Sequence, residues 1–215
     1  MAVVTLPGLA LVIALIALAS MLVGNLGALA QGNVRRLLAY SAIAHAGTLL
    51  LGVIAAGRTG PGPLYFYAAT YGLSTVGVFG VIGALEGSSP VRNIADLAGL
   101  HRRSPLLAGC LAVFVLSLAG IPPLAGFFGK FAVFASLLQL GGLAGPVGWL
   151  VILAIALSAV ALYYYLVILK QALVAAPVED AAPVKVAPAT AVALLVAAAL
   201  IVVLGVAPSL VLQWF

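Results

Sequence analysis

Six long stretches without a charged side chain dominate this sequence and constrain its fold more than any other feature. Most exceed the roughly 20 residues that an α-helix needs to cross a bilayer. Only 6% of the 215 residues are charged, whereas soluble domains carry about 25%. The sequence therefore predicts a chain embedded in a membrane along its whole length. The stretches are residues 1–34, 37–57, 59–85, 104–129, 131–169 and 186–215.

The apolar runs are continuous, which favours helices over the short alternating strands of a membrane barrel. We expect an all-α integral membrane protein with about six transmembrane helices. Residues 87–105 fit a short interfacial helix, and the proline-rich residues 176–186 fit an exposed cytoplasmic loop. The expected spans are residues 7–30, 34–56, 63–86, 105–140 with a break, 147–172 and 187–212, within a final segment 187–215.

The basic side chains predict the orientation. If the fourth segment crosses the membrane once, seven basic residues lie on one side and only Arg58 lies on the other. The positive-inside rule then places the seven in the cytoplasm and both termini in the periplasm of a bacterial inner membrane. Two crossings of the fourth segment would reduce the split to five against three. The seven are Arg35, Arg36, Arg92, Arg102, Arg103, Lys170 and Lys185.

The fourth segment contains the residues with the clearest chemical meaning. Pro122 and Pro123 lack backbone donors and clash with preceding carbonyls, so carbonyls near Ala119 lose their helical partners. Gly120, Gly126 and Gly129 accompany them, and we expect all five residues to form a helix break. Broken helices at membrane depth occur where they are buried in protein or line an aqueous cavity, often at ion sites. A proline kink used only for packing is the competing interpretation.

Lys130 lies about two turns beyond the expected break. Its charged form is costly inside a membrane, so a small change in a nearby charge can make it bind or release a proton. We predict that Lys130 is the switching group of a proton pathway. The alternatives are a lysine that extends to the membrane interface and a static ion pair.

His45 falls near the middle of the second span, about 15 Å along the helix from Arg35. Histidine titrates near neutral pH, so we predict a proton relay supported by Ser41 and Tyr40. A neutral histidine bonded to a neighbouring helix is the alternative. We interpret Glu86 as an interfacial cap, and the tyrosines at 65, 67, 71 and 163–165 as interfacial or packing side chains.

Redox chemistry in this chain is not expected. Cys110 is the single cysteine, which excludes a multi-cysteine cluster, and we expect it to pack in the interior. The sequence contains no haem-ligand pattern and no nucleotide-binding glycine loop. We therefore expect neither a cofactor nor a metal ion in this chain.

Three motifs carry a resemblance to a known family. They are GNVRRLLAYSAIAHAG at 32–47, DLAGLHRRSPLLA at 96–108 and LSLAGIPPLAGFFGKF at 116–131. The sequence resembles subunit N of NADH-quinone oxidoreductase, respiratory complex I, and the resemblance spans nearly the whole chain. The first and third motifs are shared more loosely with antiporter-like subunits, cation/proton antiporters and membrane hydrogenases.

The resemblance implies a fourteen-helix subunit built from two inverted five-helix repeats. Residues 1–175 would form the second repeat and residues 187–215 the final helix. Lys130 matches the family lysine on the broken twelfth helix, near the periplasmic half of the proton path, and His45 matches a histidine on the tenth. Such a translocase subunit would move protons, while NADH, flavin, iron–sulfur clusters and quinone react in other subunits. Its partners would be the other membrane subunits of the respiratory complex.

The sequence departs from the family pattern at two points. The family commonly has Lys-Arg at Arg35 and Arg36, and an arginine at position 35 stays protonated, so it sets a field but cannot shuttle a proton. The family's first half, with a glutamate and a lysine of its own, has no counterpart here. We therefore expect that the chain alone is not a complete pump. A cation/proton antiporter or hydrogenase subunit and a purely structural membrane subunit remain the alternatives.

Overall fold

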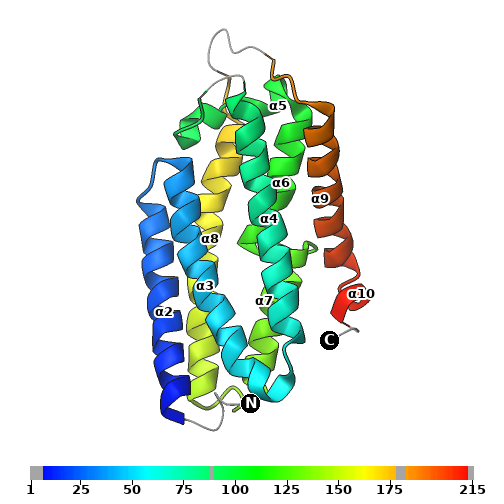
Figure 1. Ribbon diagram of the computed structural model, residues 1–215. Coiled ribbons are helices and arrows are strands. Elements are labelled where there is room, and N and C mark those ends of the chain that lie inside the picture. Colours follow the sequence, from blue (N-terminus) through cyan, green and yellow to red (C-terminus); the bar gives the residue numbers. More distant parts are fainter. Residues whose placement is uncertain (1–6, 88–89, 178–182, 213–215) are drawn as a thin grey trace.

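The computed structural model describes residues 7–87, 90–177 and 183–212, and these form a bundle of roughly aligned helices (Figure 1). The described residues contain no strand, only an isolated antiparallel bridge between Asn33 and Asn93. The long helices are α2 (Pro7–Leu29), α3 (Val34–Thr59), α4 (Gly62–Glu86), α6 (Pro105–Ala119), α7 (Ala125–Leu138), α8 (Pro146–Leu173) and α9 (Pro188–Val206). The short ones are η1 (Ile94–Leu97), α5 (Leu100–Arg103) and α10 (Ser209–Leu212).

Five helices are long and apolar enough to cross a membrane: α2, α3, α4, α8 and α9. Helices α6 and α7 have 15 and 14 residues, which is about 22 Å each and too short for a hydrocarbon core of about 30 Å. They lie one beyond the other along the bundle (Figure 1). The broken fourth segment therefore makes one crossing as a pair of half-length helices, and the all-α membrane fold with about six crossings is confirmed.

Three expectations about the connections and the last helix are wrong in detail. The stretch 87–105 is not one interfacial helix, because Gly99 adopts the left-handed region at φ 66° and separates η1 from α5. The last helix ends at Val206 rather than near 212, because Pro208 follows and α10 begins separately. The 176–186 segment is described only in part, and Val184 within it is buried rather than exposed; residues 178–182 lie outside the described residues.

Small side chains bring α2 and α3 close together. A Cβ atom at Gly24 would lie 2.5 Å from the backbone nitrogen of Ala44, and one at Gly47 would lie 2.5 Å from the carbonyl oxygen of Ala17. Small residues at helix contacts are typical of membrane proteins, where close backbone packing replaces the hydrophobic effect between helices. This contact fixes α3, and with it His45, against the buried face of α2.

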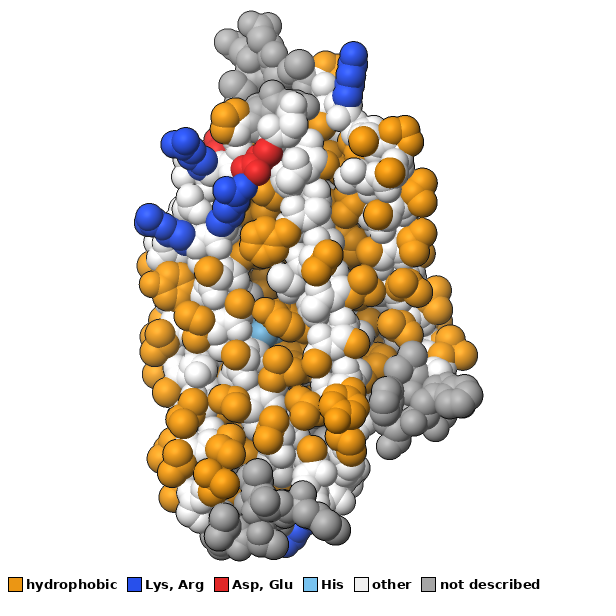
Figure 2. Space-filling model, viewed as in Figure 1, with side chains coloured by type: hydrophobic (Ala, Val, Ile, Leu, Met, Phe, Trp, Pro, Cys, Tyr) orange, Lys and Arg blue, Asp and Glu red, His pale blue; other side chains and the backbone are white. Residues whose placement is uncertain are grey.

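Apolar side chains cover the middle of the bundle, whereas Lys, Arg, Asp and Glu gather mainly at one end (Figure 2). Exposed leucine, valine and isoleucine side chains are frequent on α2, α8 and α9. An apolar exterior over the height of the bundle fits a lipid environment or contact with other membrane helices. At the charged end, Arg35 forms an ion pair with Glu86, so Glu86 has a specific partner on α3 rather than serving only as a helix cap.

Helix α9 packs directly on the break between α6 and α7. A Cβ atom at Gly205 would lie 2.0 Å from the carbonyl oxygen of Pro123 and 2.6 Å from the carbonyl carbon of Leu124. Both are backbone atoms, so they cannot move aside as a flexible side chain would. The absence of a side chain at position 205 thus allows α9 to support the broken segment.

We expect the substitution Gly205→Ala to destabilise this contact by about 1–3 kcal/mol, as overpacking does elsewhere. The measurement is the thermal unfolding midpoint of the purified protein in detergent, which should fall. Gly83→Ala is the matched control, because a Cβ there meets nothing within 4 Å. Equal midpoints for both variants would show that α9 does not need this close approach.

Candidate functional site

The break in the fourth crossing leaves two backbone carbonyls without helical partners. In a continuous helix the carbonyls of Leu118 and Ala119 would accept from residues 122 and 123, four positions on, and both of these are prolines. Helix α6 ends at Ala119 and is followed by Gly120, whose φ of 82° is left-handed. The Pro122–Pro123 peptide bond is cis, and α7 begins only at Ala125.

Lys130 supplies the missing donor. Its Nζ donates to the carbonyl oxygen of Leu118 at 2.9 Å and to that of Ala119 at 3.4 Å. The side chain is 8% exposed and forms no ion pair with any described residue. Lys130 therefore neither extends to the interface nor sits in a static salt bridge with the part of the chain that the structure describes.

The three glycines predicted for the break have different roles. Gly120 forms the turn itself, and a Cβ there would lie 3.3 Å from Lys130 Nζ, so glycine also leaves room for the lysine. Gly126 and Gly129 lie within α7, which corrects their assignment to the break. They allow close packing, because a Cβ at Gly126 would meet the Ser117 carbonyl oxygen at 1.9 Å, and one at Gly129 would meet the Tyr67 ring at 2.9 Å.

His45 lies at the centre of a buried cluster of tyrosines. Its Nδ1 is hydrogen-bonded to the Tyr67 hydroxyl of α4 at 2.6 Å, and its Nε2 to the Tyr165 hydroxyl of α8 at 3.1 Å. The ring also stacks on Tyr71, with centroids 4.6 Å apart. In a neutral imidazole one nitrogen donates and the other accepts, so one tyrosine hydroxyl accepts a hydrogen bond from the ring and the other donates to it.

The hydrogen-bonded groups continue on both sides of this cluster. Tyr165 also bonds to Ser41, one turn before His45 on α3. Beside it, Tyr164 donates to Asn25 Oδ1 of α2 at 3.1 Å, and Asn25 donates to the carbonyl oxygen of Met21 at 2.8 Å. Polar side chains from four helices therefore meet in an otherwise apolar interior.

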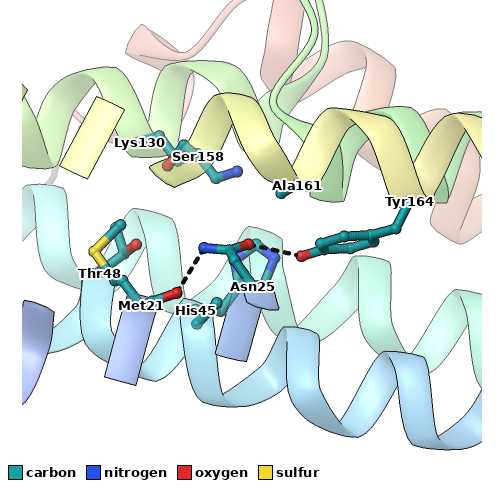
Figure 3. Close-up of a pocket in the computed structure, with 9 residues that line it drawn as sticks. Met21, Asn25, His45, Thr48, Lys130, Ser158, Ala161 and Tyr164 are labelled. Carbon is teal, nitrogen blue, oxygen red and sulfur yellow. Dashed lines mark hydrogen bonds between the residues drawn. The ribbon is translucent and has the colours of Figure 1, made fainter. Parts of the chain in front are cut away.

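A small pocket joins Lys130 to this polar cluster. It has a volume of about 10 Å³, roughly the room that one water molecule needs. Figure 3 shows Lys130 and Ser158 on one side of the pocket, facing Asn25 and His45 on the other. The lining residues are Met21, Asn25, Ala44, His45, Thr48, Lys130, Ser158, Ala161 and Tyr164.

Among the described residues, no group of three His, Cys, Asp or Glu side chains could hold a metal ion.

The structure brings together only part of the predicted site. Lys130, His45 and Ser41 belong to it, but Tyr40 packs its ring against Gly27 and has no hydrogen bond to another described residue. Arg35 and Arg36 are exposed at the charged end. Asn33 caps α3 by accepting from the Arg36 backbone nitrogen at 3.0 Å.

The sequence pattern did not single out the buried tyrosines or Asn25. Tyr67 and Tyr165 are 1% and 0% exposed, so they are not interfacial, whereas Tyr65 and Tyr163 are 52% and 65% exposed. Helical spacing indicates that the tyrosines of this run face different ways, because Tyr165 follows Tyr163 by two residues and so lies about 200° around the helix from it. The choice of which face is buried depends on the neighbouring helices.

Comparison with known proteins agrees with this architecture. Residues 1–162 match the family model of the NADH:quinone oxidoreductase/Mrp antiporter transmembrane region. The chain belongs to this family. Subunit N 2 of NADH-quinone oxidoreductase from Acidobacterium capsulatum is 51% identical over 208 residues, which are 97% of the chain and 42% of that relative. Subunit N from Moorella thermoacetica is 42% identical over 90% of the chain and 40% of its own length. The chain thus spans less than half the length of these relatives.

Two solved structures have the same fold. A chain of respiratory complex I from Thermus thermophilus with bound aureothin superposes with a TM-score of 0.80 at 39% identity, over 94% of this chain and 44% of the other. A chain of the Mrp complex from Dietzia sp. gives a TM-score of 0.83 over 95% of this chain and 45% of the other. Its identity is 24%, so this second likeness concerns the fold alone.

We expect Tyr165→Phe to destabilise the protein by about 1–3 kcal/mol, because removing a buried hydroxyl leaves its polar partners His45 and Ser41 unsatisfied. The measurement is thermal unfolding in detergent. Tyr163→Phe is the control, since that side chain is 65% exposed. A Tyr165→Phe protein as stable as the control would contradict the importance of the hydrogen bonds to His45 and Ser41.

Proposed function

We propose that this family member is part of a proton-translocating membrane subunit of NADH-quinone oxidoreductase. The observation that carries the proposal is the buried amino group of Lys130, held at a helix break and separated from His45 by a pocket of water size. The relatives named as subunit N of that enzyme support the assignment. Because the chain spans under half of their length, we propose that it works together with the remainder of such a subunit.

Lys130 is suited to exchange protons because its environment contains acceptors but no compensating carboxylate among the described residues. Two carbonyl oxygens stabilise the ammonium form, while burial disfavours it. These opposing effects leave the balance between the two forms sensitive to a charge that arrives nearby. A charge change elsewhere in the complex would then load or unload the amino group.

The proposed route runs from Lys130 through the pocket to His45 and on to Ser41. A water molecule in the pocket would bridge the amino group to the polar cluster. The Tyr67 hydroxyl would give its proton to Nδ1 of His45 and be reprotonated from the side of Lys130 and the pocket. Meanwhile Nε2–H of His45 would donate to Tyr165, whose own hydroxyl proton passes on to Ser41. Ser41 extends the chain of hydroxyls from Tyr165 toward the charged end.

In this proposal the chain is a translocase subunit without redox chemistry of its own. NADH, flavin, iron–sulfur clusters and quinone would react in other subunits, and the energy would reach Lys130 as a change in charge or conformation. The partners would be further membrane subunits of the same complex, together with lipid and protons. The relatives, which are subunits of NADH-quinone oxidoreductase, and the solved structure of respiratory complex I support such an assembly.

We further propose that the charged end faces the cytoplasm and that both termini face the periplasm of a bacterial inner membrane. Lys185 and Arg58 are both exposed, and the positive-inside rule places them on opposite sides of the membrane. Lys185→Cys should react with an impermeant maleimide from the cytoplasmic side, and Arg58→Cys from the periplasmic side. The native Cys110 is 3% exposed and serves as a low background. The reverse labelling would overturn the orientation.

The decisive test is Lys130→Met in the assembled complex. Methionine preserves the apolar length of the side chain but cannot bind a proton, so we expect proton pumping to fall by about a hundredfold or more, as for loss of an acid–base group. Coupled NADH-quinone activity should fall with it. Pumping is followed by the quench of a pH-sensitive dye in membrane vesicles, after native gels confirm assembly.

Lys170→Met is the matched control, because Lys170 is an exposed lysine near the end of α8. The complex with this variant should pump protons normally. Normal pumping by Lys130→Met in an assembled complex would favour a structural subunit. Pumping that depends on sodium, with no link to quinone reduction, would favour the antiporter alternative, with which the chain shares its fold.

A further inference from the structure

Two cavities of different character meet at Lys130. The first is the small polar pocket that contains His45. The second is a larger apolar cleft of about 310 Å³, between the broken segment with α7 on one side and α8 on the other. Lys130 and Ser158 are the two residues that line both cavities. Their side chains therefore form the boundary between the polar interior and the apolar cleft.

The hydroxyl of Ser158 is available for a new hydrogen bond. Serine and threonine hydroxyls within helices commonly bond to a carbonyl one turn back, as Ser136 does to Ala132 at 2.6 Å and Ser74 to Thr70 at 2.8 Å. Ser158 makes no hydrogen bond to any described residue of the chain. A hydroxyl in an apolar helix without such a bond gains most from a charged donor that comes within reach.

The amino group of Lys130 has donors to spare. A lysine ammonium carries three N–H groups, and the carbonyls of Leu118 and Ala119 accept from it. Lys130 and Ser158 lie on the same side of the pocket (Figure 3) and line it together. A rotation of the terminal bonds of Lys130 would carry the amino group from the helix break toward α8 without a movement of the backbone.

We propose that Ser158 positions Lys130 by accepting its amino group in a second location, which faces the His45 pocket. This inference rests on the proposed proton pathway and adds a residue to it. In the first location the amino group is bound to the break. In the second it donates to Ser158 and to water in the pocket, so it exchanges protons with the polar cluster.

The two locations differ in what they connect. At the break, the amino group donates to the Leu118 and Ala119 carbonyls, and Lys130 borders the apolar cleft as well as the edge of the polar pocket. At Ser158, it lies among Asn25, Thr48 and Tyr164, which line the polar pocket with it. Because the side chain always has an oxygen acceptor, the transfer between locations avoids an unpaired buried charge, which would be costly.

The test compares hydroxyl variants at position 158 in the assembled complex. Ser158→Ala removes the acceptor, and we expect proton pumping to fall about tenfold, the effect of losing one hydrogen bond to a charged group. Ser158→Thr restores a hydroxyl and should recover most of the rate. The double variant Ser158→Ala/Ala159→Ser moves the hydroxyl to a residue that lines only the cleft, and it should not recover.

Ser136→Ala is the control for loss of a buried hydroxyl, because Ser136 bonds only within its own helix, and it should pump normally. Native gels and the thermal midpoint establish that each variant assembles. Normal pumping by Ser158→Ala, or equal recovery by the shifted hydroxyl, would overturn the role of Ser158. Lys130→Met in the same assay separates the two proposals. If Lys130→Met pumps normally, the proposed proton pathway itself is wrong. If Lys130→Met loses pumping while Ser158→Ala pumps normally, only the role of Ser158 is refuted.

Discussion

Two carbonyl oxygens inside the bundle depend on one lysine. Pro122 and Pro123 have no N–H to offer Leu118 and Ala119, and unsatisfied carbonyls in a membrane interior cost several kcal/mol each. The amino group of Lys130 donates to both. The break thus creates acceptors for the lysine, and the lysine stabilises the break. A buried amine and an interrupted helix would each be unfavourable alone, and together they form a stable but responsive site.

The surrounding helices are arranged to hold this pair in place. The Ser117 hydroxyl at the end of α6 accepts a hydrogen bond from the Gly126 backbone in the first turn of α7 and is hydrogen-bonded to the Ser74 hydroxyl of α4. Gly205 lets α9 rest directly on the backbone of the break. Through these contacts protein covers the C-terminal side of the break from Leu124 onward, whereas Pro122 and Pro123 themselves are exposed on the described chain. The two half-length helices are thereby fixed in direction although no continuous helix joins them.

The candidate site could be predicted from the sequence where the signal was local. The proline pair, the following lysine and the histidine stand out because such residues are costly in apolar segments. The buried tyrosines did not stand out, because tyrosine is equally common at membrane interfaces. Tyr163 and Tyr165 are two residues apart, yet one faces outward and the other bonds to His45. The glycines show the same limit, since Gly120 forms the turn whereas Gly126 and Gly129 are needed for packing.

By itself, the sequence determined that the chain is a helical membrane protein, approximately where each helix lies, and that the fourth crossing is interrupted. These properties follow from the lengths of uncharged runs and from proline chemistry, which act within one segment of chain. Only the tertiary structure decided which partners the polar groups find: Lys130 with carbonyls of its own crossing, and His45 with tyrosines of α4 and α8. Those partners come from distant parts of the sequence, and their choice depends on how the faces of several helices pack at once.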